Sequence, residues 1–166
     1  MKLSRRIILT FAAASLALLA GKTADAREIV PLAGYRYDAG SIVISTSART
    51  LYYVLGNGQA IRYPVGVGKA GMAWHGRAWV SGKFIRPAWS NPPEFGGGPR
   101  IPGGDPRNPM GAAVLGLDHG NYAIHGTNDP SSIGGYVSHG CIRMHNEDIL
   151  DLYRRVPIGA NVYVIQ

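Results

Sequence analysis

A stretch of 25 residues, 87–111, excludes regular helix or strand from the middle of this chain. It holds seven prolines and six glycines, and proline lacks the N–H group that a helix or a sheet ladder needs. A flexible linker between two domains is one interpretation. We expect one long ordered loop instead, because too few residues follow it to make a second domain of ordinary size. Its aromatic side chains, Trp89 and Phe95, suit a wall or lid beside a functional site.

Residues 1–26 have the three parts of a secretory signal peptide. These are a positively charged start, an apolar run at 7–20 and the small-residue cleavage site Ala24-Asp25-Ala26. An uncleaved membrane anchor is the alternative, but the run is shorter than the roughly 18 residues of a confident span. We therefore expect an exported, periplasmic protein that begins at Arg27 and has no integral membrane span after cleavage.

The remaining sequence predicts mainly β structure with one clear helix. Short β-branched runs between glycine turns predict strands at Ser41–Thr46, Leu51–Leu55, Ala60–Val67, Ala78–Ile85, Ala112–Leu117, Asn121–His125 and Val162–Ile165. The second and third runs flank Gly56-Asn57-Gly58 and predict a hairpin, and Gly82 suggests a bulge. Apolar residues at helical spacing predict a helix over 146–156, with Asn146 as its cap. We expect a lead-in at 27–40 and a single domain at 41–166.

Cys141 is the only cysteine in the chain, which excludes an intrachain disulfide and a multi-cysteine metal site. In an oxidising exported compartment an unpaired thiol is liable to oxidation. One interpretation of Cys141 is a small buried hydrophobic residue. The other is a thiol that is retained because chemistry needs it.

The neighbours of Cys141 favour the chemical interpretation. A thiol attacks as its thiolate, and a nearby imidazole can take its proton. In an extended segment residues i and i+2 lie on the same side, so we expect His139 and Cys141 to face one space. Gly140 permits close approach, and the N–H groups of Gly140 and Cys141 suit an oxyanion hole. Arg143, on the same side, suits either a substrate carboxylate or a bracing contact within the loop.

Taken singly, His125 is best interpreted as a structural hydrogen-bonding residue. A zinc site built from His125, His139, His145 and Cys141 is the alternative, but no second cysteine or carboxylate completes a usual ligand pattern. We expect no metal and no cofactor. His75 and His119 stand in isolated loop contexts and are predicted to be surface residues.

The charge balance gives weak information about partners. Without residues 1–26 the chain has 13 basic and 9 acidic residues, a net charge of +4. This modest excess fits an acidic polymer as a partner. No cluster of basic residues is interleaved with aromatic residues, so we do not expect nucleic acid binding.

Several motifs in order resemble the signature of the L,D-transpeptidase family (the YkuD or ErfK-type catalytic domain). They are His125-Gly126-Thr127-Asn128, then Ile133-Gly134, then Ser138-His139-Gly140-Cys141-Ile142-Arg143-Met144, with 13 residues between His125 and His139. The resemblance extends from about Ser41 to Ile165. One departure follows Val65-Gly66-Val67-Gly68: many members continue with Thr-Pro-x-Gly, and this chain has Ala73-Trp74-His75-Gly76.

The resemblance implies a β-sandwich with a long Gly/Pro-rich loop and assigns roles to residues. Cys141 would be the nucleophile and His139 the general base. His125 would help to shape the pocket, and either a backbone carbonyl or Ser138 would orient the catalytic histidine. The N–H groups around Gly140 and Cys141 would bind the oxyanion.

The resemblance also implies a substrate. Members of this family cleave the terminal D-Ala from a peptidoglycan tetrapeptide stem and transfer the diaminopimelate acyl group to an amine, on another stem or on a lysine of an outer-membrane protein. An L,D-carboxypeptidase or another cysteine peptidase remains open as an alternative, as does a non-catalytic wall-binding domain.

Overall fold

The computed structural model describes residues 27–32 and 37–166, and the predicted signal peptide lies outside them. Its strands are β1 (Glu28–Pro31), β2 (Ile42–Ser45), β3 (Thr50–Gly56), β4 (Gln59–Pro64), β5 (Val67–Gly68), β6 (Gly76–Ile85), β7 (Ala113–Leu117), β8 (Ala123–His125), β9 (Tyr136–Ser138), β10 (Ile142–Arg143) and β11 (Asn161–Ile165). One α-helix, α1, spans Asn146–Arg155, and short 3₁₀ helices span Pro93–Phe95 and Pro130–Ser132. The predicted class, mainly β with one helix, is confirmed.

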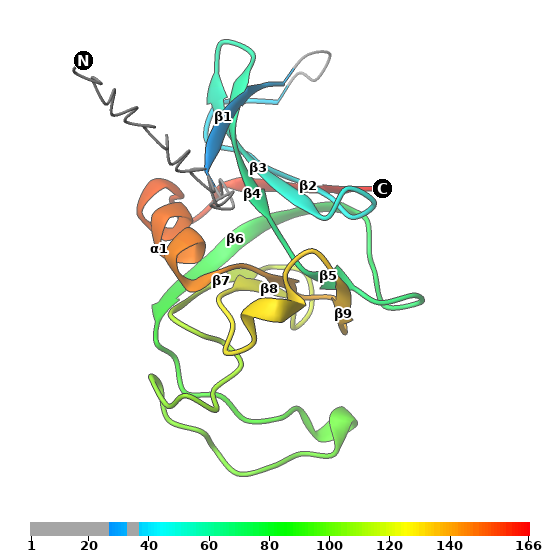
Figure 1. Cartoon of the computed structure of the whole chain (residues 1–166), viewed down its shortest axis with the longest axis vertical. Helices are drawn as coiled ribbons and strands as arrows, with labels where there is room; N and C mark the ends of the chain where they lie inside the picture. The colour runs from blue at the N-terminus through cyan, green and yellow to red at the C-terminus, as the bar shows by residue number, and fades with distance from the viewer. Residues whose placement is uncertain (1–26, 33–36) are drawn as a thin grey trace, which may run out of the picture.

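The long strand β6 connects the two halves of the main sheet. The sheet has the order β1-β4-β3-β2-β11-β6-β7-β8-β10, and a separate pair joins β5 to β9. The first half of β6 pairs with β11, and its second half pairs with β7. The register shifts between Val80 and Gly82, which confirms the predicted bulge. In Figure 1, β6 crosses the middle of the molecule, with β1 to β4 on one side and β7 and β8 on the other.

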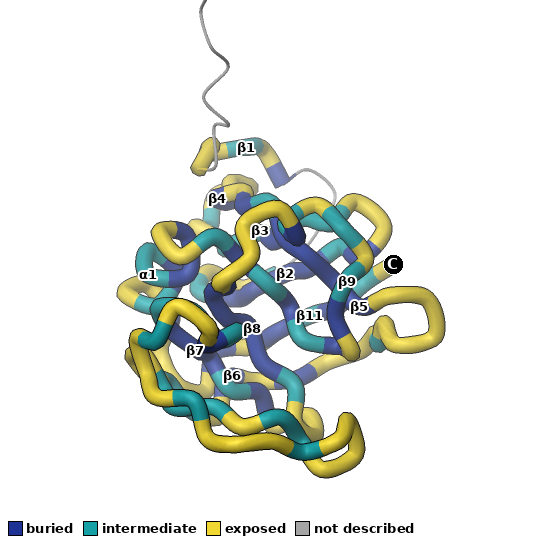
Figure 2. The backbone as a smooth tube through the Cα atoms, turned by 60° about the horizontal axis from the view of Figure 1, so that its bottom comes forward, coloured by how far each residue is buried: buried dark blue, intermediate teal, exposed yellow. Residues whose placement is uncertain are grey.

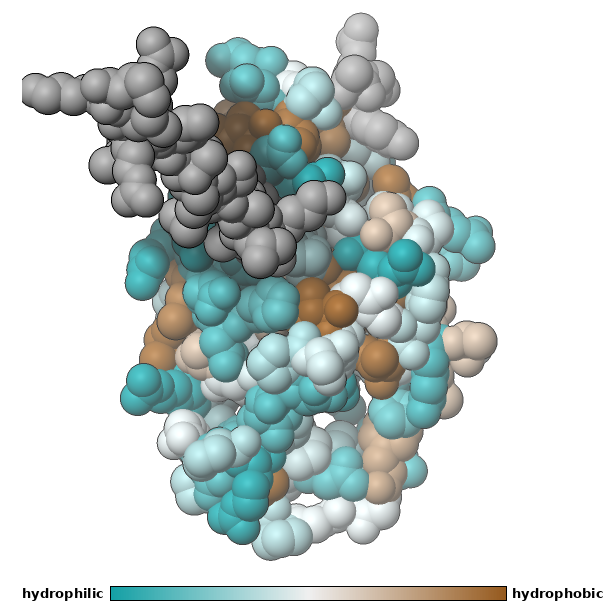
Figure 3. Space-filling model, viewed as in Figure 1, coloured by the Kyte–Doolittle hydropathy of each residue, from teal (hydrophilic) through white to brown (hydrophobic). Residues whose placement is uncertain are grey.

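One apolar core joins both halves of the sheet and the helix. Ile44 of β2, Leu115 of β7 and Leu152 of α1 are all fully buried in the same cluster. A smaller cluster around Val43 and Val54 packs on the other face of β2 and β3. Figure 2 shows the buried segments gathered along the central strands and the exposed segments along the connecting loops. On the face in Figure 3, hydrophobic side chains are scattered among hydrophilic ones.

The predicted hairpin and helix are present, with two corrections. β3 and β4 pair as a hairpin, but β4 ends at Pro64, and the next residues form β5, which pairs with β9. The helix begins at Asn146, and Asn146 does not cap it. Its Oδ1 instead accepts hydrogen bonds from the N–H groups of Ala112 and Thr127, and its Nδ2 donates to the Thr127 carbonyl. The strands β1, β9 and β10 were not predicted. β9 and β10 are too short to show a period, and β1 lies in the segment 27–40 that was expected to be a lead-in.

The loop at 87–111 is ordered by its own hydrogen bonds, as the sequence predicts. Trp89 and Ile101 pair as an antiparallel bridge, with N···O distances of 2.9 and 2.7 Å. Asn108 is buried, and its Nδ2 donates to the carbonyls of Pro87 and Pro102. The loop extends from the lower end of the molecule in Figure 1. No helix in the described residues is both long and apolar enough to cross a membrane.

A buried carboxylate lies under the first turn of α1. The Asp148 side chain is fully buried, and among the described residues neither oxygen accepts a hydrogen bond that meets the usual geometry. The nearest cation is the Arg27 guanidinium, with its Nε 3.3 Å from Oδ1. Burial is the main cause that raises the Asp148 pKa to about 6, and Arg27 opposes it.

Asp148→Asn should therefore stabilise the protein at neutral pH. The folded state holds a proton on Asp148 up to about pH 6, whereas the unfolded chain releases it near 3.8, so this group's contribution to stability is lost as the pH rises through that window. We expect the free energy of unfolding of the variant, relative to wild type, to rise by about 2 kcal/mol between pH 4 and pH 8. Urea unfolding at several pH values measures this. Glu94→Gln is the control, because Glu94 is an exposed carboxylate that does not contribute to the shift of the Asp148 pKa. A difference between Asp148→Asn and wild type that does not change with pH would contradict the prediction.

Candidate active site

A tight turn, not an extended strand, carries the predicted nucleophile. β9 ends at Ser138 and β10 begins at Ile142, and between them Gly140 has a φ of +127°. Ser138 Oγ accepts the Gly140 N–H at 3.1 Å and donates to the Cys141 carbonyl at 2.6 Å. The assumption of an extended segment, from which we expected His139 and Cys141 to face one space, is therefore wrong.

Only glycine fits at position 140. A Cβ atom built there would meet the ring of Tyr122, whose Cδ1 and Cζ would both lie 2.8 Å away. The positive φ is also costly for any residue with a side chain. Glycine therefore brings the backbone of the turn against an aromatic ring.

Cys141 is partly buried beside the end of β8. Its Sγ lies 4.0 Å from the carbonyl oxygen of Asn121. Burial raises the pKa of the Cys141 thiol, while the Ala123 N–H and the charge of Arg143 lower it by smaller amounts. The thiol is thus protonated at neutral pH in this state, and a base is needed to make it a nucleophile.

His139 is exposed and lies against the long loop. Its ring centroid is 4.4 Å from that of Phe95, at an interplanar angle of 30°. Phe95 closes the 3₁₀ helix Pro93–Phe95, and Asn91 Nδ2 donates to its carbonyl at 2.5 Å. Within the described residues, no hydrogen bond joins the His139 ring to the Cys141 thiol. The loop at 87–111 therefore forms a wall on the predicted base.

His125 lies inside the fold. Its side chain is 2% exposed, and its Nδ1 is 2.6 Å from the Gly126 carbonyl. Burial lowers the pKa of His125 to about 4, so the ring is neutral at neutral pH. We expected a residue that shapes the pocket. The His125 ring is neutral and leaves almost no surface for a ligand to touch, so any effect on the shape of the pocket would come from beneath the surface.

Arg143 supplies the positive charge of the site. Parallel pairing of β10 with β8 sets Arg143 beside His125, and two backbone hydrogen bonds to Gly66, of 2.9 and 2.8 Å, hold it on the other side. In the described part of the chain no carboxylate forms an ion pair with Arg143. Its guanidinium is therefore available for an anionic ligand.

An aromatic group beside the turn was missed by the sequence analysis. Trp74 stacks on His119, with ring centroids 4.5 Å apart, and on Tyr122, at 5.6 Å. Its indole Nε1 donates to the Gly140 carbonyl at 3.1 Å. His119 is exposed as predicted, but it is not isolated. The departure from the family pattern at Trp74 was the one signal for this group.

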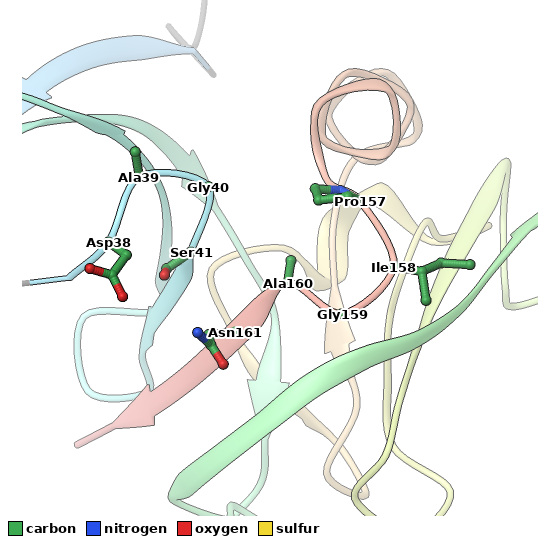
Figure 4. Close-up of a pocket in the computed structure, with 9 residues that line it drawn as sticks. All are labelled: Asp38, Ala39, Gly40, Ser41, Pro157, Ile158, Gly159, Ala160 and Asn161. Atoms are coloured by element: carbon green, nitrogen blue, oxygen red, sulfur yellow. The ribbon is translucent and has the colours of Figure 1, made fainter.

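Neither of two surface cavities is lined by Cys141 or His139. The one in Figure 4, of about 240 Å³, lies between the turns Asp38–Ser41 and Pro157–Asn161 and has a single carboxylate and no nucleophile. The other, of about 320 Å³, lies between the long loop and Asn128. The described residues contain no group of three histidine, cysteine or acidic side chains placed to hold a metal ion.

Gly140→Ala should destabilise the protein far more than Gly120→Ala. Both glycines have positive φ, but a Cβ atom at Gly120 would meet nothing within 4 Å. We expect Gly120→Ala to cost about 1 kcal/mol for its backbone conformation. Gly140→Ala should cost at least about 3 kcal/mol, because the Tyr122 ring must move. Urea unfolding checks both values, and equal losses would contradict the tight approach at Gly140.

Both the sequence and the fold have counterparts in known proteins. The family model of the L,D-transpeptidase catalytic domain (YkuD) matches residues 39–164. Among curated relatives, the Bacillus subtilis protein named as L,D-transpeptidase YkuD is 36% identical over 149 residues, which cover 89% of this chain and 79% of that protein. The Escherichia coli protein named as L,D-transpeptidase YbiS is 37% identical over 139 residues, which cover 76% of this chain and 44% of that protein. The chain thus spans less than half of the length of several of its relatives.

Solved structures agree on the fold. L,D-transpeptidase 3 from Mycobacterium tuberculosis, in complex with a faropenem-derived adduct, has a TM-score of 0.63 and 19% identity, and the match covers 77% of this chain and 60% of that one. The L,D-transpeptidase of Enterococcus faecium has a TM-score of 0.63 and 18% identity, over 77% of this chain and 50% of that one. With a family match that covers most of the described residues and this shared fold, the chain belongs to the YkuD family of L,D-transpeptidase catalytic domains.

Proposed function

We propose that the protein is an exported cysteine acyltransferase that acts on the tetrapeptide stems of peptidoglycan. The observation that carries the proposal is the turn at Ser138–Cys141 in an L,D-transpeptidase fold, which presents the only thiol of the chain. Its neighbour Arg143 forms no ion pair with any described residue. A stem peptide ends in a carboxylate, and Arg143 is a cation suited to bind such a group.

The first half of the reaction forms a thioester. His139 takes the proton of the Cys141 thiol, and the thiolate attacks the carbonyl carbon of the bond before the terminal D-Ala. A C–S bond forms, and the carbonyl electron pair moves to oxygen. When the oxyanion collapses, the C–N bond breaks, and the protonated His139 gives its proton to the leaving D-Ala amine.

The oxyanion donor in this scheme is the Cys141 N–H. The Gly140 N–H already donates to Ser138 Oγ, whereas the Cys141 N–H has no acceptor among the described residues. Ser138 thus acts on the turn by fixing the backbone on both sides of Gly140. The exposed His139 reaches the thiol when a substrate fills the space beside Phe95, since catalytic hydrogen bonds often tighten only in the complex.

The second half of the reaction transfers the acyl group. An acceptor amine attacks the thioester carbon, the C–S bond breaks, and His139 returns a proton to the sulfur. The acceptor is the side-chain amine of a second diaminopimelate stem or of a protein lysine, and water in its place gives L,D-carboxypeptidase activity. Residues 1–26 would direct the chain to the periplasm, where this substrate lies, and the domain from 41 onward would act after the lead-in at 27–40.

Cys141→Ala should abolish all turnover of a diaminopimelate-containing disaccharide tetrapeptide. The thiol is the only nucleophile in the scheme, so the expected products of the protein beginning at Arg27 are free D-Ala and a stem dimer that lacks one D-Ala, and neither should form in the variant. Mass spectrometry of the reaction mixture measures both products.

The product distribution separates the alternatives. Tripeptide without dimer would assign a carboxypeptidase, or would show that the amine acceptor is a protein. If folded wild-type protein leaves the tetrapeptide unchanged, the proposal of an enzyme is contradicted and a wall-binding domain is favoured. If folded Cys141→Ala still turns over the tetrapeptide, the proposal that Cys141 is the nucleophile is contradicted.

Arg143→Gln should make Cys141 less reactive at neutral pH. The charge of Arg143 lowers the Cys141 pKa, so its removal should raise that pKa and move the pH profile of alkylation to higher pH. The KM for the tetrapeptide should also rise, by roughly tenfold or more for the loss of one charge-assisted contact. Iodoacetamide kinetics across pH 6–10 measure the first effect.

Arg77→Gln is the matched control for charge. Arg77 is an exposed arginine of β6 that lies over the Tyr163 ring, so this variant loses the same charge away from Cys141. An Arg143→Gln profile that coincides with wild type would show that the two groups do not interact.

A further inference from the structure

Trp74 holds the peptide group that joins Gly140 to Cys141. Its indole Nε1 donates to the Gly140 carbonyl at 3.1 Å, and the indole is partly buried. The bond joins residues 66 positions apart in the chain, so it is a tertiary contact made for this turn. Neither the proposed nucleophile nor the proposed base requires it.

The loop that carries Trp74 is fastened at its start. The Lys69 N–H donates to the Ser138 carbonyl at 3.0 Å. Gly68 lies directly against the backbone of Ala73, where a Cβ atom would come within 2.8 Å of its N and Cα. The loop therefore packs closely against β5. This packing restrains the distance between the Trp74 indole and Gly140.

The indole is also fixed in its plane. Tyr122 stacks on it at an interplanar angle of 7°, and His119 stacks on it at 25°. Tyr122 in turn lies against the Cα of Gly140. The aromatic group therefore sets both the position of the turn and the direction of the indole N–H.

A planar trans peptide has its C=O and N–H on opposite sides. Trp74 binds the Gly140 C=O, so the Cys141 N–H of the same peptide must point away from the indole. Ser138 Oγ forms hydrogen bonds with both neighbouring groups: it accepts one from the Gly140 N–H and donates one to the Cys141 carbonyl. The Cys141 N–H is left without an acceptor in the described part of the chain.

From this geometry we infer that Trp74 is a positioning residue that aims the Cys141 N–H at the oxyanion of the acyl-transfer step. The inference rests on the proposed function of Cys141 as nucleophile. The hydrogen bond to the Gly140 carbonyl also polarises the peptide, which makes the Cys141 N–H a stronger donor. Trp74 touches neither the substrate nor the reacting atoms and acts only through this peptide.

The test compares two reactions of the same thiol. Acylation by p-nitrophenyl acetate passes through a tetrahedral oxyanion, with a C–S bond formed and p-nitrophenolate released. Alkylation by iodoacetamide displaces iodide at a saturated carbon and forms no oxyanion. Both need the thiolate and access to Sγ, so their rate ratio reports the oxyanion donor alone.

Trp74→Phe keeps an aromatic ring and removes the N–H. We expect it to slow acylation about tenfold, less than the loss of an oxyanion donor itself, and to leave alkylation within about twofold of wild type. With the tetrapeptide, kcat should fall while KM stays unchanged. Trp79→Phe is the matched control, because Trp79 is 53% exposed and its hydrogen bonds to Asp118 are made by its backbone N–H and carbonyl, not by its indole.

Should Trp74→Phe fold poorly, as judged by its near-UV circular dichroism, 3-benzothienylalanine at position 74 replaces it. That analogue keeps the bicyclic shape and the stacking and lacks only the N–H. A parallel loss of acylation and alkylation, or a loss of neither, would overturn the inference. The ester reaction does not depend on the natural substrate, so failure of the tetrapeptide assay would count against the proposed function and not against Trp74.

Discussion

The side-chain amide of Asn146 holds together the three segments on which the site is built. Its Oδ1 accepts the N–H groups of Ala112 and Thr127, and its Nδ2 donates to the Thr127 carbonyl. This joins the end of the long loop, the segment after β8 and the first residue of α1. Gly111 and Gly126 permit the approach, because a Cβ atom at either would collide with Oδ1. Unpaired backbone groups at such a junction would be costly, and one amide satisfies them all.

Backbone pairing and short hydrogen bonds position the residues of the site, which do not line either of the two cavities. β8 leads back from that junction to His125, and its parallel partner β10 brings Arg143 alongside. The turn before β10 is fixed from within by Ser138 and from outside by Trp74. The two segments that reach in from elsewhere, the 69–75 loop and the 87–111 loop, each contribute one aromatic residue, Trp74 or Phe95. The proposed nucleophile, Cys141, thus lies on a hydrogen-bonded turn between two aromatic side chains.

The sequence predicted the parts of the fold that rest on local patterns. The β3–β4 hairpin, the Gly82 bulge and the helix follow from period and turn residues, and each was confirmed. What it did not predict depends on long-range pairing. β9 and β10 have three and two residues, too few to show alternation, so the turn between them was taken as extended. Trp74 and Asn146 act on backbone far away in the sequence, and only the fold shows what they reach.

Two buried titratable groups, His125 and Asp148, affect stability in opposite directions. Between about pH 4 and 6.5 the unfolded chain protonates His125 while the folded chain does not, so acid weakens the fold there. Between about pH 4 and 6 the folded chain keeps a proton on Asp148 that the unfolded chain has lost, so acid strengthens it. The two linkages overlap between about pH 4 and 6 and act in opposite directions. Burial keeps His125 neutral beside Arg143, so that one cation acts on the thiol, and Asp148 offsets part of the acid sensitivity that this burial causes.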